Sequence, residues 1–349
     1  MTDPNINGYN RVVVIGASAG GPEAVSTVLR SLDPDFPAAV MVVIHLAPES
    51  PGYLVPILKK ATSLPVRSGC DQPMAPGSVY VAQPDTHLVI ERGMVRATRA
   101  PRENRFRPSA DVTFRSAAFA YRQGVIGVVM TGLLDDGTAG LFYVKRHGGT
   151  TIVQDPRDAR FSSMPENALT HIQVDYVAKA TEIGLLLNRL VREPKGAKVT
   201  VSIELPNQKA KHIFVRRPES GPSENSILEE DEKHAEPSAY TCPDCGGSLF
   251  QIKDGELTRF RCRTGHAYAL NTLLQNKNMR VEEIMASAEA ALMEATELLT
   301  RAAEEAHANN RPDHAAELDK EISRARRRIR EISQAITRAP SLSVEASQD

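Results

Sequence analysis

The sequence predicts an α/β protein with a doubly wound, mostly parallel sheet, followed by a compact cysteine-rich unit and an antiparallel helical hairpin. Residues 8–193 alternate short β-branched runs with helix-length segments, and repeated βα units of this kind build parallel sheets. Residues 240–269 hold three of the four cysteines. Residues 279–338 are almost wholly helix-forming, with one interruption at an Asn-rich turn before Pro312.

The strands and helices of the first domain follow from its apolar pattern. Continuous apolar runs typical of buried parallel strands lie at 11–15, 40–45, 125–130 and 150–154. Helix-length segments lie at 22–32, 53–62, 110–121 and 136–147. The runs 79–81 and 87–95 predict a strand pair. Ligands of such sheets bind beyond the carboxyl ends of the strands, so polar residues that follow a strand are candidate site residues.

Composition and charge exclude several classes of protein. The formal net charge is −1 and aromatic residues make up 5% of the chain, which disfavours a nucleic-acid partner. The longest apolar run, 38–46, is far shorter than a membrane span, so we expect no membrane insertion. The polar N-terminus lacks a secretory pattern, and we expect a cytoplasmic protein. Residues 194–239 are polar with an acidic run, and this composition predicts a flexible linker.

Three strand ends carry polar residues that a packed core would not require. Ser18 lies in a Gly-rich turn between a strand and a helix, where backbone amides can stabilise an oxyanion beside a serine nucleophile. His45 ends the second strand and is a candidate general base. A carboxylate after the strand 125–130 could orient that histidine, but Asp135 and Asp136 are adjacent and spacing does not choose between them. Together these residues predict a serine hydrolase.

Each of these residues also has a non-catalytic interpretation. Gly-rich βα turns often bind phosphate, a serine there is often a helix N-cap, and Asp136 could cap the next helix. A nucleotide-dependent oxidoreductase is disfavoured, because the turn is not GxGxxG and Tyr143 and Lys145 do not form a Tyr-x-x-x-Lys pair. A non-catalytic scaffold that keeps the esterase fold remains a second alternative.

Five segments of the first domain resemble the catalytic domain of the chemotaxis receptor protein-glutamate methylesterases. They are IGASAGGPEAV, IHLAPES, SADVTFRSAA, MTGLLDDGTAG and QDPRDARFSSMPENA, in the family's order. The resemblance implies Ser18 as nucleophile, His45 as base and Asp136, rather than Asp135, as third member of the triad. It implies hydrolysis of γ-glutamyl methyl esters of chemoreceptors or related signalling proteins, with glutamine deamidation as a further activity and no cofactor for catalysis.

The sequence departs from this family in two places. The family's usual loop has Gly-Met-Gly after the threonine, whereas this chain has Gly132, Leu133 and Leu134, which we expect to alter the wall of the substrate site. Only about ten residues precede the first strand, so we expect no receiver domain before it. Control would then come from expression, a separate partner or the C-terminal part.

The cysteine-rich unit has the spacing of a structural zinc ribbon. Cys242 and Cys245 form a CxxC turn, and after sixteen intervening residues Cys262 and His266 form a second close pair. Two such pairs separated by a hairpin predict a tetrahedral, closed zinc site, with a redox CxxC as the alternative. The unit resembles ribbons behind some methylesterase domains that lack a receiver. The apolar stripe of the helices 279–338 predicts packing between them or self-association of the chain.

Overall fold

The computed structural model describes residues 11–193, 235–254 and 257–338. The chain divides into two compact units, which meet between Leu270 and Asn271 and are described separately. The first of these two contains both the parallel sheet and the cysteine-rich part of the chain. The second contains most of the C-terminal helices.

The core of the first unit is a seven-stranded, wholly parallel sheet with the order β10-β9-β8-β1-β2-β5-β3. The strands are β1 (Val12–Ala17), β2 (Ala39–Ile44), β3 (Val66–Ser68), β5 (Val79–Val81), β8 (Val125–Val129), β9 (Thr150–Gln154) and β10 (Tyr176–Ala178). The chain builds outward from β1 in one direction and then returns to its other side with β8. This reversal of strand order confirms the predicted doubly wound fold and creates a crevice beside β1.

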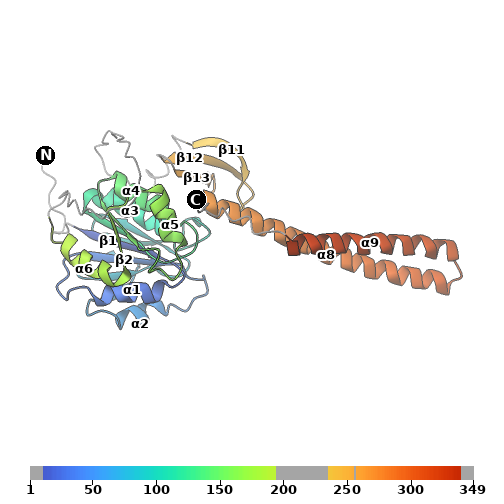
Figure 1. The fold of residues 1–349 in the computed structure, drawn as a ribbon, viewed down its shortest axis with the longest axis horizontal. Coiled ribbons are helices and arrows are strands. Elements are labelled where there is room, and N and C mark those ends of the chain that lie inside the picture. Colours follow the sequence, from blue (N-terminus) through green and yellow to red (C-terminus); the bar gives the residue numbers. More distant parts are fainter. Residues whose placement is uncertain (1–10, 194–234, 255–256, 339–349) are drawn as a thin grey trace. The chain divides into compact units, whose positions relative to one another are not determined.

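Helices cover both faces of the sheet (Figure 1). One layer contains α1 (Gly21–Arg30), α2 (Leu54–Lys59) and α6 (Ala180–Leu190), and the other contains α3 (Ala110–Tyr121), α4 (Thr138–Arg146) and α5 (Ser163–His171). Because side chains alternate along a strand, Val13 and Ile15 of β1 pack in the first layer and Val12 and Val14 in the second. Burial on both faces explains why β1 reads as a continuous apolar run.

The predicted pairing of 79–81 with 87–95 is wrong. Strand β5 joins the parallel sheet, because Val79 and Val81 are buried in one helical layer and Tyr80 in the other. Strand β6 (His87–Glu91) instead pairs with β7 (Met94–Thr98) in a small antiparallel sheet completed by β4 (Gln72–Pro73). Gly93, with φ of 75°, makes the hairpin turn between β6 and β7.

The cysteine-rich unit is a four-stranded antiparallel sheet, called the ribbon below. Its strands are β11 (Ala235–Thr241), β12 (Ser248–Asp254), β13 (Leu257–Cys262) and β14 (Ala267–Ala269), in that order. The predicted linker extended to residue 239, but β11 begins at Ala235. The remainder of that linker, 194–234, lies outside the described residues.

The second unit is a pair of long helices that run antiparallel, as predicted (Figure 1). They are α8 (Leu270–Ala308), which begins nine residues before the predicted hairpin, and α9 (Pro312–Arg338). Ala303 of α8 and Ala315 of α9 are small residues that are buried. Several apolar side chains of α8 stay exposed, including Ile284 and Leu298. None of the described helices is long and apolar enough to cross a bilayer.

Candidate active site and metal centre

The three predicted catalytic residues follow three neighbouring strands of the sheet. Ser18 follows β1, His45 follows β2, and Asp136 lies in the loop between β8 and α4. The sheet order β8-β1-β2 brings their carboxyl ends together at the crevice beside β1. The backbone amide of Ser18 donates to the carbonyl of Thr131 at 2.9 Å, which ties the first loop to the third.

His45 bridges the other two residues. Its Nδ1 lies 3.0 Å from the hydroxyl of Ser18, and its Nε2 lies 2.6 Å from Oδ2 of Asp136. A carboxylate only accepts hydrogen bonds, so Nε2 carries the proton and Nδ1 is left to accept from the Ser18 hydroxyl. The side chain of His45 is 4% exposed, and the ring of Phe106 stacks on it at 3.6 Å between centroids. The imidazole is therefore held in the tautomer that a general base for Ser18 requires.

The carboxylate of Asp136 is buried and accepts hydrogen bonds from several donors besides His45. They are Nδ2 of Asn104 at 2.9 Å, Oγ of Ser109 at 2.7 Å, and the backbone amides of Ala110 at 2.7 Å and Asp111 at 3.3 Å. Both amides belong to the first turn of α3, so the carboxylate accepts hydrogen bonds at the positive end of that helix. Burial opposes ionisation, but His45, Asn104 and Ala110 offset it and keep the pKa of Asp136 well below its ordinary value.

The geometry also separates the two adjacent aspartates. Asp136 contacts His45 through its side chain, whereas the backbone carbonyl of Asp135 accepts from Thr138 at the start of α4. Asp136 does not cap α4, since Gly137 is the N-cap residue and no side chain caps that helix. Asp136 instead caps α3, a helix that precedes it in the chain.

Several residues around the site were not singled out from the sequence. Asn104 and Phe106 lie in one tight turn, 103–106, that connects Asp136 with His45 through their side chains. Ser109 follows this turn and donates to Asp136. The only signal that pointed this way was the SADVTFRSAA segment, which matched the family motif and contains Ser109.

Gly132 lies in the loop after β8, close to the side chains of Ser18 and Met164. A Cβ atom at this position would lie 2.8 Å from Cβ of Ser18 and 2.1 Å from the sulfur of Met164, so glycine is needed for the close approach. The two leucines that replace the family's Met-Gly pair follow it. Leu133 is 52% exposed, and Leu134 adopts φ of 68°, a conformation that glycine takes more readily.

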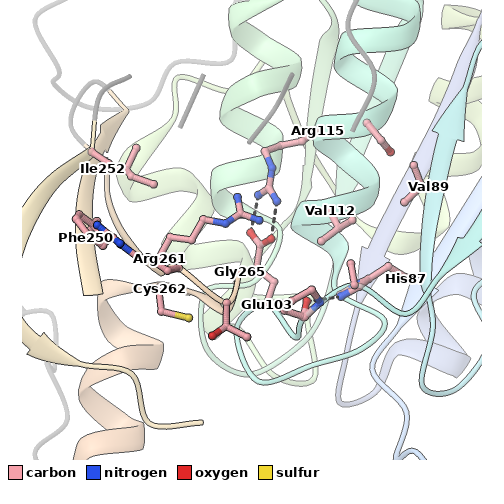
Figure 2. Close-up of a pocket in the computed structure, with 16 residues that line it drawn as sticks. His87, Val89, Glu103, Val112, Arg115, Phe250, Ile252, Arg261, Cys262 and Gly265 are labelled. Carbon is pink, nitrogen blue, oxygen red and sulfur yellow. Dashed lines mark hydrogen bonds and ion pairs between the residues drawn. The ribbon is translucent and has the colours of Figure 1, made fainter. Parts of the chain in front are cut away.

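A cavity of about 620 Å³ lies apart from these residues. It is lined from the first domain by residues such as His87, Glu103 and Arg115, and from the ribbon by Phe250 and Arg261 (Figure 2). His87 is fully buried, donates from Nε2 to the carbonyl of Pro101 at 3.0 Å and accepts from the amide of Ser109 at 3.3 Å. Burial lowers its pKa. These contacts identify His87 as a structural residue behind the site.

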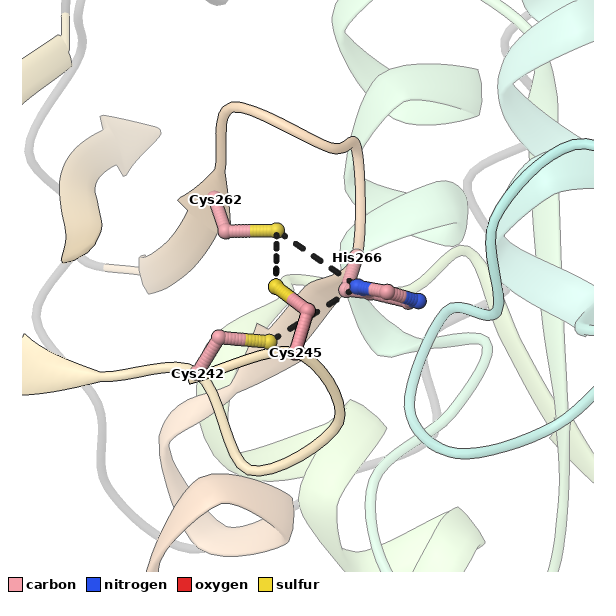
Figure 3. Close-up of side chains that lie close together, drawn as sticks. All are labelled: Cys242, Cys245, Cys262 and His266. Carbon is pink, nitrogen blue, oxygen red and sulfur yellow. Dashed lines mark hydrogen bonds between the residues drawn. The ribbon is translucent and has the colours of Figure 1, made fainter. Parts of the chain in front are cut away.

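The four predicted metal ligands converge in the ribbon (Figure 3). The ligand atoms of Cys242, Cys245, Cys262 and His266 all lie within 4.8 Å of one another. The sulfurs of Cys245 and Cys262 are 3.7 Å apart, and Nδ1 of His266 lies 3.7 Å from the sulfur of Cys242 and 3.5 Å from that of Cys262. A tetrahedral zinc with bonds of about 2.1–2.3 Å places its ligands about 3.5–3.8 Å apart, so this donor set fits such an ion.

Two tight turns present these ligands. In the first, the amide of Gly246 donates to the carbonyl of Cys242, and Gly246 has φ of 71°. In the second, the amide of Gly265 donates to the carbonyl of Cys262, and Gly265 has φ of 105°. Both glycines adopt the left-handed backbone that lets a short turn close around a metal. The cluster is therefore able to bind a metal.

One family model and several known proteins match the first part of this chain. The CheB methylesterase family model matches residues 13–187, from β1 into α6. A provisionally named methylesterase/glutaminase of Leptospira interrogans is 37% identical over 180 residues, which cover 51% of this chain and 93% of that protein. A protein-glutamate methylesterase/protein-glutamine glutaminase of Anaeromyxobacter dehalogenans is 40% identical, with coverages of 52% and 53%.

A solved structure is also similar to part of this chain. The crystal structure of the Thermotoga maritima CheB methylesterase catalytic domain has 34% sequence identity and a TM-score of 0.49, and covers 52% of this chain and 98% of that one. The family model spans the part of the chain that carries Ser18, His45 and Asp136. The chain belongs to the CheB methylesterase family.

Proposed function

We propose that this chain hydrolyses γ-glutamyl methyl esters on chemoreceptors or related signalling proteins, with Ser18, His45 and Asp136 as its catalytic triad. The observation that carries the proposal is the continuous hydrogen-bonded chain from Ser18 Oγ through both nitrogens of His45 to Asp136. Family membership supports the substrate class, since the relatives are named protein-glutamate methylesterases.

The reaction follows from the positions of these groups. Ser18 Oγ attacks the ester carbonyl as its proton passes to Nδ1 of His45, and the buried Asp136 stabilises the imidazolium that forms. His45 then gives this proton to the leaving methoxide, which departs as methanol and leaves an acyl group on Ser18. Water activated by His45 hydrolyses that acyl-enzyme and regenerates the serine.

Backbone amides stabilise the oxyanion in this proposal. Helix α1 begins at Gly21, three residues after Ser18, and its N-cap Gly20 provides no side-chain cap. Within its first turn the amide of Gly21 donates to the carbonyl of Ser18 and Pro22 has no N–H, so the helix acts through its partial positive charge and its other first-turn amides, which favour negative charge nearby. The oxygen that becomes negative during attack at Ser18 would lie beside these groups.

Glutamine deamidation uses the same steps with ammonia as the leaving group. The acyl-enzyme is identical, because a glutaminyl amide and a glutamyl methyl ester share the same acyl part. His45 would protonate the departing nitrogen as it protonates methoxide. Both activities also appear in the names of the relatives.

The ribbon binds one structural zinc ion in this proposal. Its ligands are Cys242, Cys245, Cys262 and His266, a set of four that leaves no coordination position for a substrate. Zinc would hold the two turns together, and it takes no part in the ester chemistry at Ser18. Reduced thiols are needed for this role, which supports a cytoplasmic location.

The experiment that tests the function measures methanol released from a methylated chemoreceptor. The purified full chain should release methanol continuously, and Ser18→Ala should reduce the rate to the background of receptor alone. Circular dichroism and thermal melting of both proteins control for folding. Equal methanol release by wild type and Ser18→Ala would reject the proposal.

A further inference from the structure

Strand β14 of the ribbon pairs along its outer edge with the loop that carries the 103–106 turn. The amide of Asn104 donates to the carbonyl of Ala267 at 2.8 Å, and the amide of Ala267 donates to the carbonyl of Arg102 at 3.3 Å. The amide of Ala269 donates to Oδ1 of Asn104, also at 2.8 Å. The ribbon thus binds both the backbone and the side chain of one residue in the first domain.

The nitrogen of the same Asn104 side-chain amide contacts Asp136. This Nδ2 donates to Oδ1 of Asp136 at 2.9 Å and to Oδ2 of Asp111 at 2.8 Å. Asn104 is 1% exposed, so these hydrogen bonds are made without competition from bulk water. Because the N–H of Ala269 donates to Oδ1 of Asn104, the side-chain amide is oriented with Nδ2 facing the carboxyl groups of Asp136 and Asp111. One planar amide therefore connects β14 directly to the catalytic aspartate.

The turn itself has a backbone that needs outside support. Asn104 and Arg105 have φ of 51° and 72°, and two successive non-glycine residues in this region are unfavourable. Glu103, which begins the turn, forms a buried ion pair with Arg115 of α3, with both contacts at 2.5 Å (Figure 2). Burial opposes ionisation of Glu103, but Arg115, together with Arg261 and Arg259 of β13, keeps its pKa below the ordinary value.

We propose that the ribbon positions the triad: β14 holds the side-chain amide of Asn104, and Asn104 in turn holds the carboxylate of Asp136 in line with His45. The proposal rests on the proposed hydrolase function of Ser18. Asn104 is a positioning residue here, since it touches Asp136 and not the substrate. The ribbon becomes a part of the catalytic framework, and loss of its metal loosens the triad.

Two variants separately test the two contacts of the Asn104 amide, with Asp136 and with Ala269. Asn104→Gly removes the amide, and glycine adopts φ of 51° without strain, so the turn should keep its backbone. Ala269→Pro removes the N–H that donates to Oδ1 of Asn104, at the last residue of β14, and also fixes φ there. Ala269→Ser is the matched control, because it changes the same side chain and keeps the N–H.

The rate of catalysis and the geometry of the hydrogen bond between His45 and Asp136 are measured separately on the full chain. For a small activated ester, Asn104→Gly should lower kcat by about 10- to 100-fold with KM unchanged, as expected for a lost hydrogen bond to a buried charge. Ala269→Pro should lower kcat by about three- to tenfold, and Ala269→Ser should match wild type. Proton NMR of the hydrogen between His45 and Asp136 reports the geometry without any substrate, and its downfield resonance should move in the first two variants only.

Metal removal supplies the third measurement. Chelation should lower kcat of the wild type and shift the same proton resonance, while Asn104→Gly, which has already lost the connection, should show no further change in either. Thermal melting and metal content accompany each sample. If Ala269→Pro does not fold, this comparison takes its place.

The outcomes distinguish the two proposals. Absence of Ser18-dependent hydrolysis in wild type would reject the proposed function, and the NMR resonance alone would then decide whether the ribbon positions Asp136. An unchanged kcat and resonance in Asn104→Gly, or equal values for Ala269→Pro and Ala269→Ser, would overturn the positioning role. A fall in melting temperature with unchanged kcat and resonance would show that the contact is only structural.

Discussion

Replacing Asp136 by asparagine changes one atom and should disable the enzyme. The five groups that contact this carboxylate are all donors: His45, Asn104, Ser109 and the amides of Ala110 and Asp111. An asparagine brings an NH₂ group that also donates. Whichever way the new amide is turned, its NH₂ group faces donors, and at the Oδ2 position it opposes both His45 and the fixed backbone amide of Ala110.

The size of the effect follows from the tautomer of His45. An NH₂ group opposite Nε2 favours the imidazole with its proton on Nδ1, and that nitrogen can then no longer accept the proton of Ser18. With the amide turned the other way, the base keeps its tautomer but loses the negative charge that stabilises the imidazolium. The corresponding change in a serine protease lowers kcat by about 10⁴-fold. We expect a loss of about 10³- to 10⁴-fold for Asp136→Asn.

The assay is steady-state hydrolysis of a small ester by the full chain, with Asp135→Asn as the matched control. Asp135 is also buried, but its backbone carbonyl accepts from Thr138 while the side chain of Asp136 contacts His45. Asp135→Asn should keep kcat within about tenfold of wild type, as a substitution beside the triad rather than in it. An Asp136→Asn enzyme with more than a tenth of wild-type kcat, or an equal loss in Asp135→Asn, would refute the reasoning.

Wild type and Asp136→Asn together also test whether Asp136 is ionised in the folded chain. Its pKa is lowered in the folded chain, so its charged form adds stability above its unfolded pKa of about 3.9, and this stability is lost as pH falls toward the folded pKa. The difference in unfolding free energy between wild type and Asp136→Asn should therefore shrink as the pH falls below about pH 4, toward the folded pKa. A difference that grows as the pH falls would contradict this assignment.

Three further substitutions test other contacts. Gly132→Ala should lower kcat by about tenfold or more, because the new Cβ would meet Ser18 and Met164, and equal esterase rates would count against the close packing. Phe106→Leu should lower kcat/KM by about three- to tenfold through loss of the stack on His45, and unchanged kinetics would show that the stack is dispensable. Cys245→Ser should reduce bound zinc from one ion per chain to well below one, and full zinc by elemental analysis would exclude Cys245 as a ligand.

The residues of the proposed triad could be singled out from the sequence because they depend on the most regular part of the fold. Buried parallel strands appear as continuous apolar runs, and Ser18 and His45 stand directly after two of them. The choice of Asp136 over Asp135 could not be made from spacing, because the loop after β8 has no repeating geometry. It came from the resemblance, and the hydrogen bond to His45 agrees with it.

The residues that support the triad could not be predicted in the same way. Asn104 lies in an irregular segment where no periodic pattern indicates which side chains point inward. Its hydrogen bonds join it to Asp136, 32 residues away, and to Ala269, 165 residues away. Contacts of this kind depend on how complete elements pack, and a single sequence does not encode them locally. The strand β5 was misassigned for a related reason, since a short apolar run suits either kind of sheet.

Labelling by a fluorophosphonate probe tests the central claim, that Ser18 is an activated nucleophile, most directly. Such probes form a stable bond only with a serine whose proton is removed by a neighbouring base. Peptide mass spectrometry of the labelled full chain should place a single adduct on Ser18, and the Ser18→Ala protein should remain unlabelled. An esterase-active wild type that carries the adduct on a different residue, or an equally labelled Ser18→Ala protein, would contradict the account.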